Sequence, residues 1–359
     1  MAKKREDKTI RLSIIISIAL SLAIILLILY FTIDETTIEQ LKSVDIRYEF
    51  FLLAALLNVL YWVLWGARLK ILANAINPDV KISLWKSTKI VIANLFLAGI
   101  TPSMAGGEPV RIYLLNKEGM SVGESTAAVL GERLIDAVFI ILIVPLAIFV
   151  FKDVEEVQFL RTGLWIGILI FSIGIILFIY AIIRPEKVKS FLIYLNKKLR
   201  RFSKKKEKES KVISRINREV DNFHKSMTCF VGKRKRSLFF ASIVTVLFWS
   251  TGFMIPSMIL LGLNQDPYFI ESYAAQILLL VIIMMPTTPG SSGVAEFGIA
   301  GLYVVLVGES LIGVFVILYR LITYHMSLIF GAIFQYRIFK SVASFSMDMI
   351  KKEEKDIDK

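Results

Sequence analysis

Two short segments of this 359-residue chain place helix-breaking residues and a carboxylate within otherwise apolar sequence. The first begins Thr101-Pro102 and continues to Gly106 and Glu108, and the second runs over residues 288–296 with the same order of Thr-Pro, Gly and Glu. Proline and glycine leave backbone N–H and C=O groups unpaired, which is tolerated at membrane depth only where protein or water lines the segment. Both segments are therefore candidate sites for a polar ligand.

These segments have two interpretations. Proline and glycine also kink membrane helices without any function, but a carboxylate in each segment favours a functional site. Broken helices that enter from opposite faces are typical of inverted-repeat transporters, in which half-helix N-termini present positive dipole ends to an anionic substrate. The match between the two segments is short, so an internal inverted repeat stays an open alternative.

A second set of candidates lies inside apolar helices. Glu132 and Asp136 share one helix face, and Arg133 can reach Asp136 at a spacing of i+3. Such charges normally pair or face a wet cavity, because an unpaired charge in the bilayer is costly. They form either a structural salt bridge at the cytoplasmic interface or a site in which Arg133 and Arg111 neutralise a phosphate, since a guanidinium matches phosphate oxygens bidentately.

The last apolar stretch carries Arg320, with Tyr324 one turn further on. The expected partner of Arg320 is Glu296 or a lipid headgroup. His325 is expected to hydrogen-bond a backbone group or a hydroxyl rather than to relay protons. Asn94 either contributes to the first segment or simply hydrogen-bonds a neighbouring helix.

The full set of candidate substrate-binding residues is Asn94, Thr101, Pro102, Gly106, Gly107, Glu108, Arg111, Glu132, Arg133, Asp136, Pro286, Pro289, Gly290, Gly293, Glu296, Arg320 and Tyr324. In this hypothesis the three arginines hold a headgroup phosphate, and Glu108, Asp136 and Glu296 hold a cationic or hydroxyl-rich headgroup or keep the arginines paired. The sequence has no P-loop, zinc-binding helix motif, nucleophile elbow or kinase motifs. We therefore expect no catalytic residue, metal or cofactor, and we favour transport over catalysis.

The elements that must position these residues are membrane helices. Hydrophobic residues make up 56% of the chain and charged residues 20%, with a mean hydropathy of +0.66, and no segment alternates as in an outer-membrane barrel. The predicted fold class is all-α, with six full spans at residues 12–33, 50–66, 126–150, 161–183, 237–262 and 311–335. Two interrupted stretches, residues 84–105 and 271–308, are expected to form re-entrant hairpins; six to ten spans satisfy the same pattern.

The distribution of Lys and Arg among the loops predicts how the chain is oriented in the membrane. Residues 184–236 contain 19 Lys and Arg against 5 Asp and Glu, a net charge of +14, so the positive-inside rule puts this loop in the cytoplasm. The acidic loops 34–49 and 151–160 are then external, and the second span returns the chain to the cytoplasm at Arg68 and Lys70. We expect a multi-pass protein of the cell membrane with both termini cytoplasmic.

The basic loop contains two amphipathic helical patterns, which favour binding to anionic lipid. An orientation signal and a docking site for a lipid-modifying enzyme are the alternatives, and confinement of the charge to one loop argues against nucleic acid. One transmembrane domain, residues 1–340, would include this loop, and residues 341–359 form a charged tail. Membrane lipids are the expected partners, and self-association is left open.

Several of these residues together resemble the flippase-like family to which the transmembrane domain of lysylphosphatidylglycerol synthase belongs. The resemblance covers roughly residues 10–340 and rests on Asn94, on the segment from Pro102 to Arg111, on residues 132–136 and on residues 286–296. It implies movement of a lipid with a modified polar headgroup, such as an aminoacylated phospholipid or a polyisoprenyl-linked sugar, from the cytoplasmic to the outer leaflet. Relatives often have a double glycine after the proline of the second segment, where this chain has Gly290-Ser291.

Two alternatives to transport follow from the same residues. In one, the charges only stabilise the helix bundle, and the protein is a non-transporting partner of a lipid-modifying or glycosyltransferase enzyme. In the other, the chain is an integral-membrane transferase acting on a polyprenyl phosphate, which would need a metal or a base at the two segments.

Overall fold

A computed structural model describes residues 45–101, 106–150, 158–200, 209–232, 234–283 and 293–334, and every regular element in these ranges is a helix. The predicted all-α class is therefore confirmed. The predicted first span at residues 12–33, the tail at 341–359 and the candidate residues Pro102, Pro286, Pro289 and Gly290 lie outside the described residues.

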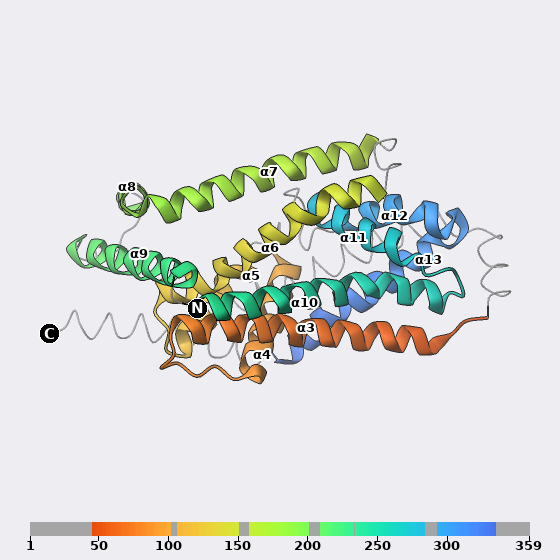
Figure 1. Cartoon of the computed structure of the whole chain (residues 1–359), viewed down its shortest axis with the longest axis horizontal. Coiled ribbons are helices and arrows are strands. Elements are labelled where there is room, and N and C mark those ends of the chain that lie inside the picture. The colour runs from red at the N-terminus through yellow and green to blue at the C-terminus, as the bar shows by residue number, and fades with distance from the viewer. Residues whose placement is uncertain are drawn as a thin grey trace, which may run out of the picture.

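Five of the described helices are long and apolar enough to cross a membrane. They are α3 (Tyr48–Ile76), α6 (Val122–Val150), α7 (Gln158–Ile183), α10 (Lys235–Gly262) and a final helix that begins as α13 (Glu309–Arg320) and continues through one π-helical turn, Leu321–His325, to residue 334. These five helices coincide with five of the six predicted spans. In Figure 1 they run in the same general direction, and α3 lies alongside α10.

Both interrupted stretches contain helices that are shorter than a membrane span. The first contains α4 (Leu84–Ile100) and is followed by α5 (Gly107–Lys117), and the second contains α11 (Phe269–Ile283) and α12 (Val294–Val307). At 1.5 Å per residue, none of these helices spans a hydrocarbon layer of about 30 Å on its own. The predicted breaks are therefore present.

The first break is stabilised by Thr101, which ends α4. Its hydroxyl donates to the Leu97 carbonyl at 2.7 Å and accepts from the Gly106 N–H at 2.9 Å. A Cβ atom at Gly107 would lie 2.5 Å from the Asn94 side-chain oxygen, so glycine lets α5 begin this close to α4 without displacing the Asn94 amide. The polar and glycine residues of the motif thus bring the start of α5 against α4.

The second break ends at Gly293, whose φ of +92° is unfavourable for other residues. The Gly293 N–H donates to Glu296 Oε2 at 2.7 Å. The carboxylate therefore satisfies a backbone donor at the beginning of α12.

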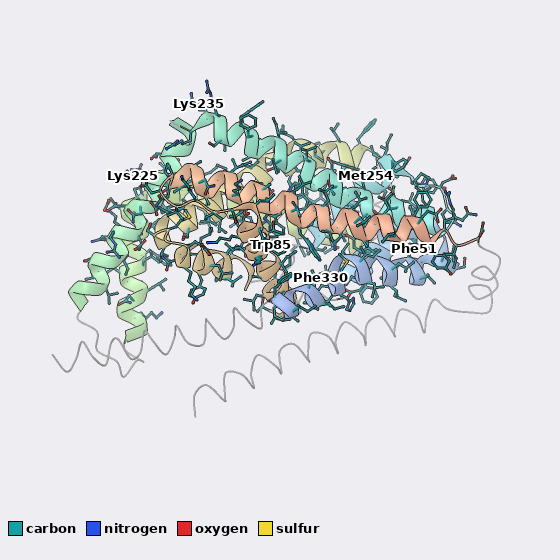
Figure 2. All side chains as sticks on the ribbon, turned by 90° about the horizontal axis from the view of Figure 1, so that it is seen from below. Phe51, Trp85, Lys225, Lys235, Met254 and Phe330 are labelled. Atoms are coloured by element: carbon teal, nitrogen blue, oxygen red, sulfur yellow. The ribbon has the colours of Figure 1, made fainter. Side chains whose placement is uncertain are left out.

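Helices α8 (Pro185–Arg200) and α9 (Glu209–Gly232) lie at one end of the bundle, close to the beginning of α10 (Figure 1). Figure 2 shows Lys225 of α9 and Lys235 of α10 at this end, whereas Phe51 of α3 lies at the opposite end. The basic residues that α8, α9 and the first turn of α10 contribute are therefore collected at one end of the long axis.

Candidate functional site

Six charged side chains from three helices form a connected cluster within the bundle. We call it the charge cluster, and it consists of Arg68 of α3, Glu108 and Arg111 of α5, and Glu132, Arg133 and Asp136 of α6. It contains three cations and three anions, so it is formally neutral. Glu132 lies ten residues into α6, about 15 Å along the helix axis from its first residue.

Arg68 joins the two carboxylates of α6 and is completely buried. Its Nε donates to Glu132 Oε1 at 3.1 Å, and its Nη1 donates to Asp136 Oδ1 at 2.5 Å. Trp249 Nε1 also donates to Asp136 at 2.9 Å, and Thr245 accepts from Arg68 at 3.2 Å. This dense set of partners offsets the cost of placing the ions out of water.

Arg68 lies inside the bundle and not at the surface, where its sequence position had placed it. The predicted span ended at residue 66 and placed Arg68 at the cytoplasmic surface, but α3 continues to Ile76 and buries this side chain. The available signal was the charge balance of α6, because Glu132 and Asp136 have a single cation, Arg133, close to them in sequence. A second buried carboxylate requires another cation. Trp249 and Thr245 were also not predicted, and no local sequence signal marks them.

Arg111 connects α5 to this buried part. Its side chain is fully buried, its Nη1 forms an ion pair with Glu132, and its guanidinium lies 5.3 Å from the centre of the Trp65 ring. The Nε and Nη2 atoms of Arg111 are buried without a hydrogen-bond partner among the described residues. Arg111 therefore retains donor capacity within the cluster.

The exposed edge of the cluster is formed by Glu108 and Arg133. Their side chains are 37% and 39% exposed, and Arg133 Nη2 lies 3.1 Å from Glu108 Oε1. The same Glu108 oxygen lies 3.8 Å from Arg111 Nη2, so two arginines converge on one carboxylate oxygen. Arg133 also reaches Asp136 at 3.3 Å, the i+3 contact expected from the sequence.

A second group contains Glu296 of α12, Arg320 of α13 and Tyr324 of the π-helical turn. Arg320 Nε lies 2.9 Å from Glu296 Oε1, so Glu296 is the partner found for this arginine, and the guanidinium lies 3.9 Å from the centre of the Tyr324 ring. Tyr324 OH donates to the Gly99 carbonyl at 3.0 Å. This group is therefore linked to the end of α4, just before the first break.

His325 and Asn94 lie near these groups. His325 Nδ1 lies 3.1 Å from the Arg320 carbonyl, which fits the expected backbone hydrogen bond. Asn94 is buried beside Gly107 and thus lies at the first break. Thr101, Gly106 and Gly293 shape the breaks through the backbone contacts described above.

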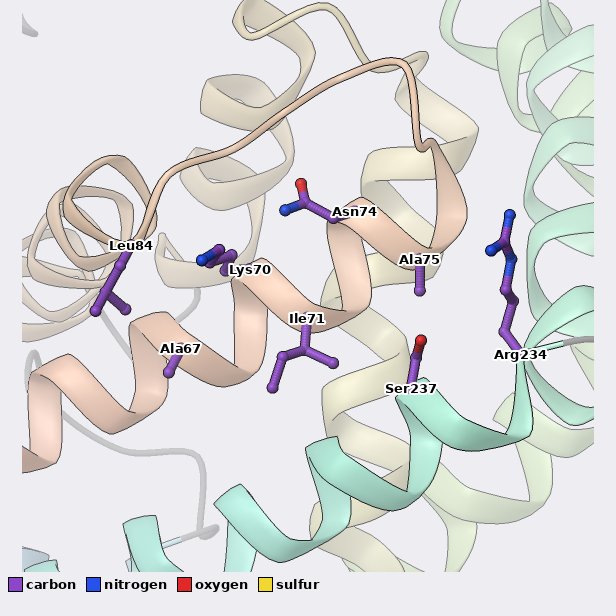
Figure 3. A pocket seen from close by; sticks show the side chains of 8 residues that line it. All are labelled: Ala67, Lys70, Ile71, Asn74, Ala75, Leu84, Arg234 and Ser237. Atoms are coloured by element: carbon purple, nitrogen blue, oxygen red, sulfur yellow. The ribbon is translucent and has the colours of Figure 1, made fainter.

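A groove lies apart from both charged groups, between α3 and α10 near the basic end (Figure 3). It has a volume of about 440 Å³, and Lys70 and Arg234 are the charged residues among its lining. None of the predicted site residues lines it. Within the part of the chain that the structure describes, no group of three or more His, Cys, Asp and Glu is suited to hold a metal ion.

The long apolar helices, the two interrupted segments and the buried charges define a multi-pass α-helical membrane protein. A family model described as the transmembrane region of lysylphosphatidylglycerol synthase matches residues 14–331. The chain belongs to this family.

Three relatives are archaeal proteins described as UPF0104 membrane proteins. The chain is 36% identical to one from Archaeoglobus fulgidus over 317 residues, which cover 88% of this chain and 94% of the relative. It is 26% identical to one from Methanocaldococcus jannaschii, with 69% and 72% covered, and 24% identical to one from Methanothermobacter thermautotrophicus, with 71% and 74% covered. No solved structure matches the chain.

Proposed function

We propose that this protein moves a polar-headed phospholipid or polyisoprenyl-linked lipid across the cell membrane, with the headgroup phosphate at Arg111 and Arg133. The observation that carries the proposal is the convergence of these two arginines on one oxygen of Glu108, at 3.8 and 3.1 Å. The membership in a family named after a phospholipid synthase supports a lipid as the ligand.

The pattern of burial separates a structural part of the charge cluster from a part that can exchange partners. Arg68, Glu132 and Asp136 are buried and hold one another through several hydrogen bonds. Glu108 and Arg133, in contrast, are more than one-third exposed. A ligand would therefore reach the cluster at Glu108, while Arg68 and its two carboxylates keep α3 and α6 in place.

Charge balance gives this exchange a physical basis. The charge cluster is neutral, so the addition of a phosphate would leave an excess negative charge in a medium of low dielectric constant. If the phosphate instead displaces the Glu108 carboxylate, the arginines remain neutralised throughout. The displaced carboxylate can then accept from an ammonium or hydroxyl group of the same headgroup. Glu108 is thus proposed as a temporary counter-ion rather than a permanent structural one.

The hydrogen-bonding capacity of the arginines is compatible with this role. Arg111 Nε and Nη2 and Arg133 Nε are buried donors without hydrogen-bond partners among the described residues. A phosphate has several acceptor oxygens and can satisfy donors from two guanidinium groups at once. Apolar lipid tails would stay in the bilayer while the headgroup occupies this polar position.

Reconstitution in liposomes tests the proposal. Vesicles would carry a fluorescent phospholipid or, in a separate sample, a polyprenyl-phosphate probe, and the accessibility of the inner leaflet to dithionite or to an enzyme would report translocation. We expect wild-type protein to move at least one probe, and Glu108→Gln and Arg133→Ala to reduce the rate by at least tenfold, about the effect of losing one charge-assisted contact.

Glu118→Gln provides a matched control, because Glu118 also forms an ion pair, with Lys86 at 2.5 Å, at an exposed position outside the charge cluster. This variant should translocate at the wild-type rate. Full activity of Glu108→Gln and Arg133→Ala at normal protein levels would exclude the proposed phosphate position. Absence of movement of every probe by wild-type protein would instead favour a non-transporting partner of a lipid-modifying enzyme.

A further inference from the structure

The two basic helices α8 and α9 differ in how their apolar side chains are covered. In α9, Val220 and Met227 are 8% and 2% exposed, because this helix packs against the beginning of α6. In α8, Phe191 and Tyr194 are 59% and 60% exposed. The sequence patterns of the two helices are similar, and Val188 and Leu195 of α8 are half-buried, but the two aromatic rings of α8 are left uncovered by the described bundle.

The exposed side chains of α8 form a single stripe. Lys187, Phe191, Tyr194 and Lys198 follow one another at i, i+4, i+7 and i+11, so they lie on one helix face, and all four are exposed. No acidic residue interrupts this stripe. Two aromatic rings flanked by two long basic side chains are typical of surfaces at the boundary between lipid and water.

Chain connectivity places α8 beside the membrane. The candidate span in α7 ends at Ile183 and α8 begins at Pro185, so a single residue, Arg184, separates them. In Figure 1, α7 runs across the picture while α8 is seen nearly end-on. The α8 helix therefore turns across the direction of the span at the point where the span ends, which is the arrangement needed to lie along a membrane surface.

The opposite side of α8 is fixed to α9. Lys189 Nζ lies 2.8 Å from Glu186 and 2.7 Å from Asp221 of α9. The hydrogen bond to Asp221, and after it the one to Glu186, raises the pKa of Lys189 above its ordinary value. Glu219 of α9 in turn accepts from the Gly123 N–H at the beginning of α6, at 2.8 Å. The stripe is thus held outward on a helix pair that is itself attached to the bundle.

We propose that the Lys187, Phe191, Tyr194 and Lys198 stripe of α8 docks on the headgroup layer of the membrane and prefers anionic lipid. The aromatic rings enter the interface, and the two ammonium groups meet headgroup phosphates. Because α9 contacts α6, which carries three residues of the charge cluster, docking also holds the proposed headgroup site at a fixed depth. The proposal does not depend on which lipid is translocated.

A spin label or environment-sensitive fluorophore at position 194 tests the docking. The full-length protein with Cys229→Ser and Tyr194→Cys would be placed in nanodiscs of zwitterionic lipid alone or with one-third anionic lipid. We expect the label to be protected from a water-soluble quencher and accessible to a membrane-soluble one, with greater protection in the anionic nanodiscs. Asn196→Cys, on the opposite side of α8, is the matched control and should not respond to lipid composition.

Charge neutralisation tests the lysines. Lys187→Gln and Lys198→Gln should each shift the equilibrium away from the docked form by about fivefold in anionic nanodiscs, with little change in zwitterionic ones. Equal exposure of position 194 to the aqueous quencher in both lipid mixtures would overturn the proposal. So would protection that is seen in cells but is absent from nanodiscs of either composition, since that result would assign the stripe to a protein partner.

Discussion

At the scale of single residues, the charge cluster separates side chains that maintain the structure from side chains that are available to a ligand. Arg68 has no exposed surface and neutralises two carboxylates of α6, whereas Glu108 is accessible and shares its oxygen between two arginines. The same type of interaction therefore has different consequences at the two positions, because burial decides what happens when a partner is removed.

Removal of Arg68 should destabilise the protein strongly. In Arg68→Ala, Glu132 and Asp136 lose the cation that joins them, and the cost of an unpaired buried charge is about 3–5 kcal/mol. Thermal unfolding of the purified protein in detergent, followed by tryptophan fluorescence, should show a large fall in midpoint or loss of folded protein. An Arg68→Ala variant as stable as the wild type would contradict the structural role.

Glu108→Gln, in contrast, should impair translocation with little effect on stability. Because Glu108 is more than one-third exposed, its ion pairs contribute about 0–1 kcal/mol to stability, so the unfolding midpoint should change little while translocation is lost. The two measurements on the same purified sample distinguish the roles. A fall in stability as large as that of Arg68→Ala would show that Glu108 is structural.

At the scale of elements, each helix break is stabilised by specific contacts. Thr101 and Gly106 connect the two sides of the first break, and Glu296 satisfies the Gly293 N–H at the second. A π-helical turn interrupts the last span beside the second group, and Asn58 of α3 donates to the Ile322 carbonyl in it at 2.7 Å. Such turns are frequent at functional sites of helices.

The close packing of α5 on α4 gives a prediction for a double substitution. Gly107→Ala would place a Cβ atom 2.5 Å from the Asn94 side-chain oxygen and should lower stability by about 1–3 kcal/mol. Combination with Asn94→Ala should recover part of this loss, because the second change removes the obstructing atom. Denaturation of both single variants and the double variant would measure the coupling; strictly additive effects would contradict the contact.

At the scale of the whole molecule, the basic residues of α8, α9 and the beginning of α10 lie at one end (Figures 1 and 2). If the positive-inside rule applies, this end faces the cytoplasm and the loop between α10 and α11 faces outward. Charge and architecture together thus predict how the bundle is oriented in the membrane.

Cysteine labelling in intact cells tests that orientation. In a Cys229→Ser background, Lys225→Cys on α9 should react with a membrane-impermeant maleimide only after permeabilisation, and Asp266→Cys in the loop between α10 and α11 should react before it. Both native residues are exposed, so accessibility within the fold does not bias the comparison. The reverse labelling pattern would contradict the predicted orientation.

The sequence by itself determined the class of the protein and the order of its elements. Apolar length identified five described spans and the two interrupted stretches, because the cost of burying backbone and charged groups in lipid acts on each segment locally. Motif residues also indicated where the helices break. The sequence did not place Arg68 correctly, since a basic residue close to the end of an apolar segment is equally compatible with the membrane surface.

The tertiary structure decided which charges meet. Arg68 and Glu132 are 64 residues apart in the chain, and Tyr324 and Gly99 are 225 apart, so no local spacing rule predicts these contacts. They depend on how α3, α5 and α6 pack, and on how the last helix meets α4. The same packing covers the apolar face of α9 and exposes Phe191 and Tyr194 of α8, a difference that two similar amphipathic patterns do not contain.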